Sequence, residues 1–191
     1  MKSICVFCGS STGYHPIYQK AAKDLGKHLA KENIRLIYGG GSVGLMGILA
    51  DSAMAHGGEV VGIIPRFLYE KEVGHDGVSE LVIVESMHER KQKMAEMAQG
   101  FVAMPGGIGT MEELFEIFTW SQLALIRKPV ALLNINNFYD DILHLLNKMV
   151  KEGFLKEINV ASLITTQNIH ELTAKMLAYH HVETPKWINK T

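Results

Sequence analysis

The stretch FVAMPGGIGTMEELFEIFTW, residues 101–120, joins a short apolar run to a helix-like segment through a proline and a cluster of glycines. The apolar run has the length of a buried strand, and segment 110–126 has the periodicity of a helix. Gly106, Gly107 and Gly109 let the backbone approach a ligand closely, and a helix start offers unpaired N–H donors. The stretch therefore predicts a strand–turn–helix unit with a seat for an anion.

The same alternation of short apolar runs and longer helix-period segments extends along the chain. Strands are expected at 3–8, 34–38, 59–64, 80–84, 100–104, 129–133 and 161–165. Helices are expected at 15–32, 43–56, 86–99, 110–126, 138–152 and 168–181, and the polar segment 65–79 is expected to be a long loop. This order predicts an α/β fold, a Rossmann-like doubly wound parallel sheet of about six to seven strands with helices on both faces.

Length and composition indicate an ordinary globular protein. Its 191 residues suit a single nucleotide-binding domain, 1–191. A net charge of −1 gives no overall field that would attract nucleic acid or a membrane surface. The sequence has no signal-peptide pattern, no apolar run near the roughly 18 residues that span a bilayer, and only two cysteines. These features predict a cytoplasmic protein.

Three predicted strands end in glycine-rich turns that lead into helices. The turns are CGSSTG at 8–13, YGGGSVGLMG at 38–47 and MPGGIGTMEE at 104–113. Because the carboxyl ends of parallel strands meet at one edge of a sheet, the turns predict a nucleotide or sugar-phosphate pocket. The candidate binding residues in the first two turns are Gly9, Ser10, Gly40, Gly41 and Ser42.

Other chemical patterns have less support. The dinucleotide fingerprint G-x-G-x-x-G occurs at 39–44, but the next strand does not end in the acidic residue that holds a ribose. Ser42 lies in a G-x-S-x-G pattern without a placed His or Asp. Cys5 and Cys8 have redox spacing, yet Cys5 falls inside a strand, so buried, inert thiols are expected. The histidines show no metal-ligand spacing, so no metal is predicted.

Segment 86–99 places a cation on a core-facing stripe. A capping box beginning at Ser86 fixes the helix start. At about 100° per residue, Arg90 falls on the apolar stripe that contains Met94. Because burying an unpaired guanidinium is costly, Arg90 needs an anion, either a substrate group or an acidic side chain. Lys91 adds a second cation near the same helix end.

Glu113 has two interpretations. Thr110 and Glu113 fit a T-x-x-E capping box, in which the glutamate bonds back to the threonine N–H. A catalytic carboxylate at Glu113 fits the sequence equally well. Glu112 and Glu116 are expected on a solvated face of this helix, which is apolar on two sides and so favours a second packing surface such as a dimer seam.

Two motifs together resemble a known family. PGGIGTMEE at 105–113 fits the signature P-G-G-x-G-T-x-x-E, and MHERK at 87–91 lies at the expected distance upstream. The chain resembles the LONELY GUY family of cytokinin riboside 5′-monophosphate phosphoribohydrolases over nearly its whole length. The older family label of lysine decarboxylase has no physical support, because no lysine lies in a recognisable pyridoxal phosphate setting.

The resemblance implies hydrolysis of the N-glycosidic bond of cytokinin riboside 5′-monophosphates, and of AMP as well, to free base and ribose 5-phosphate. It implies a homodimer, no cofactor, and Arg90 and Glu113 as catalytic residues. The substrate contacts that it implies are Glu72, Arg90, Lys91, Gly107, Ile108, Gly109, Thr110, Met111, Glu112, Glu113 and Thr119, with N–H groups of the turn from Gly106 to Thr110 on the 5′-phosphate.

The residue types suit this chemistry. Cleaving the C1′–N9 bond builds oxocarbenium character on the ribose, which a carboxylate at Glu113 would stabilise while orienting or deprotonating water. Arg90 would either keep Glu113 ionised or contact the ribose or phosphate. A non-catalytic nucleotide-binding or sensing module is the alternative function, and an esterase using Ser42 is a third.

Overall fold

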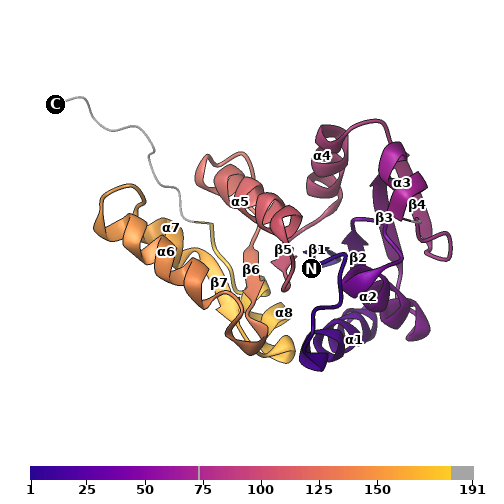
Figure 1. Ribbon diagram of the computed structural model, residues 1–191. Helices are drawn as coiled ribbons and strands as arrows, with labels where there is room; N and C mark the ends of the chain where they lie inside the picture. The colour runs from indigo at the N-terminus through magenta and orange to yellow at the C-terminus, as the bar shows by residue number, and fades with distance from the viewer. Residues whose placement is uncertain (73, 182–191) are drawn as a thin grey trace.

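The computed structural model describes residues 1–72 and 74–181, in which strands and helices alternate (Figure 1). The strands are β1 (Ser3–Phe7), β2 (Arg35–Tyr38), β3 (Val60–Pro65), β4 (Glu80–Val84), β5 (Phe101–Ala103), β6 (Val130–Leu133) and β7 (Leu163–Thr166). The helices are α1 (Pro16–Lys31), α2 (Gly44–Ala55), α3 (Arg66–Glu72), α4 (Met87–Met97), α5 (Ile108–Gln122), α6 (Asp140–Lys151), α7 (Glu157–Ala161) and α8 (Ile169–Leu177), with a 3-10 turn, η1, at Ile135–Asn137. Every strand and helix expected from the sequence is present.

The seven strands form one parallel sheet with the order β4-β3-β2-β1-β5-β6-β7. The chain builds outward from β1 to β4, returns to the centre, and then adds β5 to β7 on the other side of β1. The strand order therefore reverses between β1 and β5, which is where sheets of this kind bind ligands. The predicted Rossmann-like, doubly wound parallel sheet is confirmed.

Helices cover both faces of the sheet (Figure 1). Helices α1, α2 and α8 pack on one face, and α4, α5, α6 and α7 pack on the other. Because successive side chains of a strand point to opposite faces, Ile4 and Val6 of β1 join the first layer, and Cys5 and Phe7 join the second. Burial on both faces explains why the strands are continuous apolar runs in the sequence.

The expectation of a long loop over 65–79 is wrong, because α3 occupies its first half. The expectation rested on Pro65, Gly74 and Gly77, which flank the helix instead of interrupting it. The sequence RFLYEKE between them has no helix breaker and several good helix formers, and a proline immediately before a helix is well tolerated.

Helices α1 and α2 approach each other most closely at Gly26. A Cβ at this position would collide with the Leu49 carbonyl oxygen and lie 2.9 Å from the Ala53 nitrogen. Both atoms belong to the α2 backbone, which cannot move aside as a flexible side chain can. Glycine at position 26 therefore sets the distance between the two helices.

Replacing Gly26 by alanine should destabilise the protein by about 1–3 kcal/mol, although alanine is the better helix former by about 1 kcal/mol. The free energy of unfolding in urea measures the effect. Lys27→Ala, at the exposed neighbouring position, is the control for helix propensity and should change stability by less than about 0.5 kcal/mol. A Gly26→Ala protein as stable as the wild type would contradict the close helix contact.

Candidate active site

The three glycine-rich turns meet at the carboxyl edge of the sheet, beside the β1–β5 reversal. The Gly9 N–H donates to the Pro105 carbonyl at 3.2 Å, and the Leu45 N–H donates to the Gly9 carbonyl at 3.0 Å. A cavity of about 200 Å³ lies over this junction. It is lined by Gly9, Ser10, Ser11, Thr12, Gly13, Tyr18, Leu45, Pro105, Gly106, Gly107 and Phe138. The structure thus brings the predicted residues Gly9, Ser10, Gly106 and Gly107 together.

Gly40 and Gly41 do not line this cavity, because the chain that follows α3 covers them. The His75 N–H donates to the Gly40 carbonyl at 2.9 Å, and Gly41 forms an isolated antiparallel bridge with Gly74. His75 Nε2 also lies 2.9 Å from Asp51 Oδ1 of α2. The second turn therefore holds the α3–β4 connection in place, and the half-buried Ser42 follows directly. Substrate contacts from this turn stay a prediction.

Helix α5 begins at Ile108, two residues earlier than expected, with Gly107 as its N-cap. Gly107 has no side chain that could bond to the first N–H groups of the helix, and no side-chain cap is formed. Residues Gly107, Ile108 and Gly109 are all exposed. The first N–H groups of α5, with the positive end of the helix dipole, are therefore available to an anion.

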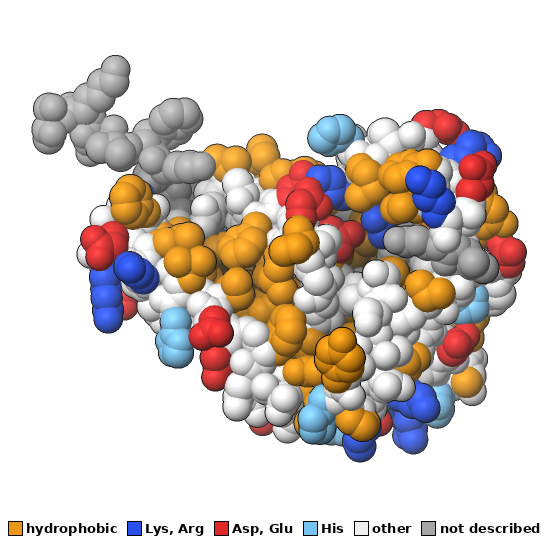
Figure 2. All heavy atoms as spheres, viewed as in Figure 1, with side chains coloured by type: hydrophobic (Ala, Val, Ile, Leu, Met, Phe, Trp, Pro, Cys, Tyr) orange, Lys and Arg blue, Asp and Glu red, His pale blue; other side chains and the backbone are white. Residues whose placement is uncertain are grey.

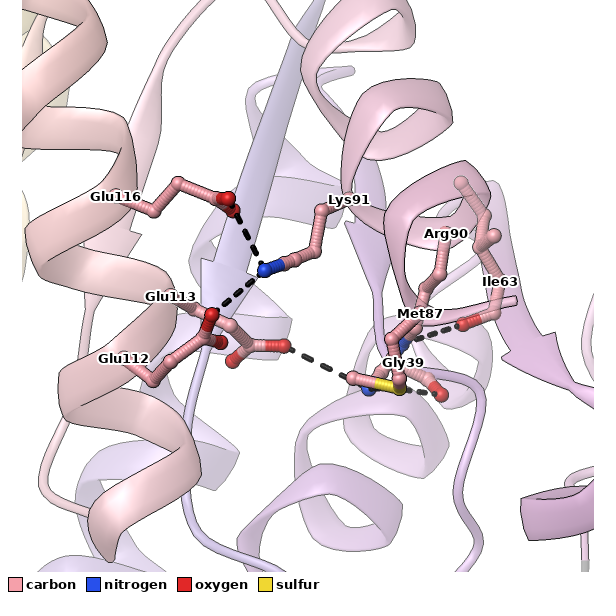
Figure 3. A network of polar contacts seen from close by, with 8 residues as sticks. All are labelled: Gly39, Ile63, Met87, Arg90, Lys91, Glu112, Glu113 and Glu116. Atoms are coloured by element: carbon pink, nitrogen blue, oxygen red, sulfur yellow. Dashed lines mark hydrogen bonds and ion pairs between the residues drawn. The ribbon is translucent and has the colours of Figure 1, made fainter.

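The capping-box interpretation of Glu113 is wrong. Thr110 lies inside α5 and not at its N-cap, and its side chain is buried against Gly106. The Glu113 carboxylate points away from the helix start and toward α4 (Figure 3). Its Oε1 lies 3.7 Å from Arg90 Nη1, so the acidic partner that Arg90 requires is Glu113.

Arg90 is fixed by two backbone carbonyl groups, one within β3 and one directly after β2 (Figure 3). Its Nε donates to the Ile63 carbonyl at 3.1 Å, and its Nη2 donates to the Gly39 carbonyl at 3.2 Å. A Cβ on residue 39 would collide with Nη2, so glycine at this position admits the guanidinium. Only 9% of the Arg90 side chain and 11% of the Glu113 side chain are exposed. The pair is therefore buried, with Nη1 held in place facing the carboxylate.

Burial controls the protonation of Glu113. Desolvation raises the pKa of its carboxyl to about 7, against the lowering effect of the Arg90 guanidinium. Glu112 raises this pKa further, Lys91 lowers it, and Glu116 raises it. A carboxyl with this pKa gains and loses its proton near neutral pH, as a general base requires.

Lys91 lies between two other carboxylates of α5 (Figure 3). Its Nζ is 2.6 Å from Glu112 Oε1 and 3.0 Å from Glu116 Oε1. The exposed fraction of the Glu116 side chain is 23%, so the expectation that Glu116 lies on a solvated face is wrong. Helical periodicity could not reveal this contact, because it does not say which helix lies alongside. Helix α4 thus presents cations to the anions of α5.

The remaining predicted contacts are less closely grouped. Glu72 ends α3, and its side chain lies outside the described part of the chain. Met111 packs against the second core layer. Thr119 is exposed and about 9 Å along α5 from Glu113, and its hydroxyl donates to the Phe115 carbonyl at 2.7 Å. In this chain Thr119 does not join the Arg90–Glu113 pair, and its role stays a prediction.

The two thiols are buried and free, as expected. Burial raises the pKa of both Cys5 and Cys8 well above the usual range, and a protonated thiol is a poor nucleophile. Within residues 1–72 and 74–181, no group of three or more His, Cys, Asp or Glu side chains could hold a metal ion. No helix of the same ranges is long and apolar enough to cross a bilayer.

Comparisons of the sequence with known proteins point to one group. Residues 46–176 match a family model described as "Possible lysine decarboxylase". The chain is 46% identical to cytokinin riboside 5′-monophosphate phosphoribohydrolase LOG7 of Arabidopsis thaliana, over 93% of this chain and 82% of the relative. It is 45% identical to the phosphoribohydrolase LOG of Oryza sativa subsp. japonica, over 93% of this chain and 74% of the relative.

Solved structures with lower identity share the fold. The molybdenum cofactor carrier protein of Chlamydomonas reinhardtii is 20% identical, with a TM-score of 0.68 over 93% of this chain and 98% of that one. The molybdenum cofactor binding protein of Rippkaea orientalis is 19% identical, with a TM-score of 0.69 over 93% of this chain and 97% of that one. At these identities the likeness establishes the fold alone.

Replacing Glu113 by glutamine should change how stability depends on pH. Because the pKa of the folded-state carboxyl, about 7, exceeds the ordinary value of 4.5, wild-type stability falls as pH rises between these values. Glutamine removes this loss. From about pH 5 to about pH 8, the unfolding free energy of the variant should therefore rise relative to the wild type by on the order of 2 kcal/mol.

Urea unfolding of both proteins across this pH range measures the difference. Glu96→Gln, which removes the same charge from an exposed position on α4, is the control and should show no such trend. A stability difference that does not vary with pH would contradict the raised pKa of Glu113.

Proposed function

The chain belongs to the family of cytokinin riboside 5′-monophosphate phosphoribohydrolases, and on that premise we propose that it hydrolyses the N-glycosidic bond of these nucleotides and of AMP. The products are the free base and ribose 5-phosphate. The observation that carries the proposal is the buried Arg90–Glu113 pair, with 3.7 Å between Nη1 and Oε1, beside the turns that meet at the β1–β5 reversal. A proton-exchanging carboxylate next to a phosphate seat is what this hydrolysis needs.

The 5′-phosphate binds at the start of α5 in this proposal. The N–H groups of the turn from Gly106 to Thr110 donate hydrogen bonds to the phosphate, and the 9–13 turn lines the other side of the cavity. Lys91 supplies a cation nearby. Holding the phosphate in this way fixes C1′ of the ribose over Glu113 and lowers the entropic part of the barrier. Glu72, Met111, Glu112 and Thr119 complete the proposed substrate contacts.

Glu113 acts in its ionised form. As the C1′–N9 bond breaks, the bonding electron pair leaves with the base, which takes up a proton from solvent at a ring nitrogen. The carboxylate stabilises the positive charge that develops at C1′ and accepts a proton from the attacking water, whose oxygen bonds to C1′. After the reaction Glu113 returns to solvent the proton that it accepts from the attacking water. Arg90 Nη1 stabilises the ionised carboxylate. These steps require neither a metal nor a redox cofactor.

Decarboxylation of lysine, which the description of the family model suggests, gains no support from the site. Such chemistry uses a lysine amine as a Schiff-base partner, and that amine must lose its charge. The lysine beside the Arg90–Glu113 pair is Lys91, and its ammonium contacts both Glu112 and Glu116, which favours the charged form.

We also propose that the chain is one nucleotide-binding domain that forms a homodimer in the cytoplasm. All seven strands share one sheet, which supports a single domain. Apolar side chains gather over the α5–α6 side of the molecule (Figure 2). Among the exposed large apolar residues, Leu123 at 41% and Leu125 at 68% follow α5, and Leu145 at 45% lies on α6. A second copy of the chain would remove such a surface from water.

The purified protein should release free base from AMP and from N6-isopentenyladenosine 5′-monophosphate, together with an equal amount of ribose 5-phosphate. Chromatography of the reaction mixture measures both products. Adenosine, which lacks the 5′-phosphate, is the control and should react at least about a hundredfold more slowly, because it cannot use the phosphate seat. Intact nucleotide with tight, saturable binding would favour the non-catalytic module. If the protein showed no binding and no turnover, every nucleotide function would be refuted.

Glu113→Gln should lower kcat by at least about a hundredfold, the usual effect of removing one electrostatic stabiliser. In the wild-type protein kcat/KM should rise with pH and level off above the Glu113 pKa of about 7, because the ionised carboxylate is the active form. Glu96→Gln is the matched control and should keep wild-type turnover. Near-normal turnover of Glu113→Gln would remove the carboxylate from the mechanism.

A further inference from the structure

Glu116 lies beside the Arg90–Glu113 pair but is not among the residues that the family motifs imply. It follows Glu113 by three positions on α5, so the two side chains are neighbours on the helix surface. Its Oε1 contacts Lys91 Nζ at 3.0 Å, whereas its buried Oε2 accepts no hydrogen bond within the described part of the chain. Burying a carboxylate oxygen without a donor is unfavourable, so stability alone does not explain this placement.

Three carboxylates of α5 lie near Lys91 of α4, and the Lys91 ammonium forms ion pairs with two of them. Figure 3 shows its ammonium between Glu112 and Glu116, while the Glu113 carboxylate turns toward Arg90. Lys91 and Glu113 line the same small space, together with Phe7, Glu116 and Ile117, but the ion pairs of Lys91 are with Glu112 and Glu116. The two contacts at 2.6 Å and 3.0 Å therefore hold the ammonium away from Glu113.

We propose that Glu116 is a positioning residue for the phosphoribohydrolase reaction: by binding Lys91, it keeps the ammonium off Glu113 and leaves Arg90 as the ion-pair partner of that carboxylate. The inference rests on the proposed function. If Lys91 paired with Glu113 directly, the carboxylate would have two close cations and would be a weaker base toward water.

Glu116 is better placed for this task than Glu112. The Glu112 side chain is 49% exposed, and an ion pair in contact with water contributes little and is easily exchanged. The Glu116 side chain is 23% exposed and lies on the same enclosed space as Glu113. Its contact with Lys91, at 3.0 Å, is longer than the 2.6 Å contact of Glu112 but is the less screened of the two.

The charged groups that face Glu113 come from two helices. Arg90 and Lys91 of α4 favour its ionised form, and Glu112 and Glu116 of α5 disfavour it. The thiols of Cys5 and Cys8 lie on the β1 side and stay protonated. Removing the charge of Glu116 should therefore lower the pKa of Glu113 for two reasons. A neighbouring negative charge is lost, and Lys91 is released to approach Glu113.

Glu116→Gln tests the proposal, since it keeps the shape of the side chain and removes its charge. The acid limb of kcat/KM should move to lower pH by about half a unit or more. Glu116→Asp retains the charge and should restore part of the wild-type profile, and Glu96→Gln should leave the profile unchanged. A Glu116→Gln profile identical to that of the wild type would overturn the proposal.

A double-mutant cycle with Lys91→Met separates action through Lys91 from direct repulsion between the two glutamates. If Glu116 acts through Lys91, the shift caused by Glu116→Gln shrinks in the Lys91→Met background. An equal shift in both backgrounds would show direct repulsion and overturn the positioning role.

The titration of the Glu113 carboxyl, followed by carbon-13 NMR in the unliganded protein and assigned by its loss in Glu113→Gln, provides the same comparison without turnover. The Glu113 titration should move to lower pH in Glu116→Gln. The same substitution should move it less in the Lys91→Met background. Absence of base release by the wild-type protein would overturn the proposed function. If the wild-type protein releases base but the Glu113 carboxyl titrates at the same pH in Glu116→Gln as in the wild type, the positioning role of Glu116 is overturned and the proposed function is not.

Discussion

Burying the guanidinium of Arg90 removes it from water, and its donors and charge then need partners within the protein. The Ile63 carbonyl of β3, the Gly39 carbonyl after β2 and the Glu113 carboxylate of α5 supply them. One side chain on α4 therefore ties β3, the turn after β2 and helix α5 to one point. Glycine at position 39 follows from the same requirement, because a larger residue would occupy the space of the guanidinium.

The charge balance around this point gives the site its chemistry. Two cations of α4 face three carboxylates of α5, so the cluster is neutral when Glu113 is protonated and carries one negative charge when it is ionised. Burial raises the pKa of Glu113 until the two states have similar free energies near neutral pH. A residue that resembles a helix cap in the sequence thus becomes an acid that gains and loses its proton near neutral pH.

Much of the fold could be predicted from the sequence, because strands buried on both faces leave continuous apolar runs and the helices keep their period. The need of Arg90 for an anion was also predictable from its place on an apolar stripe. The T-x-x-E pattern misled, since Thr110 could be an N-cap only if Gly107 were not, and spacing cannot distinguish the two. The Lys91–Glu116 contact joins different helices, so no pattern within one segment could reveal it.

The reversal of strand order beside β1 has a consequence for how the chain folds. In β1, Cys5 pairs with Ile37 of β2 on one side and with Phe101 of β5 on the other. During synthesis β1 to β4 leave the ribosome before β5, so one edge of the buried and mostly apolar β1 waits without a neighbour. Such an edge can pair with other chains. Changes that slow the docking of β5 therefore lengthen the time for which this edge is open to aggregation.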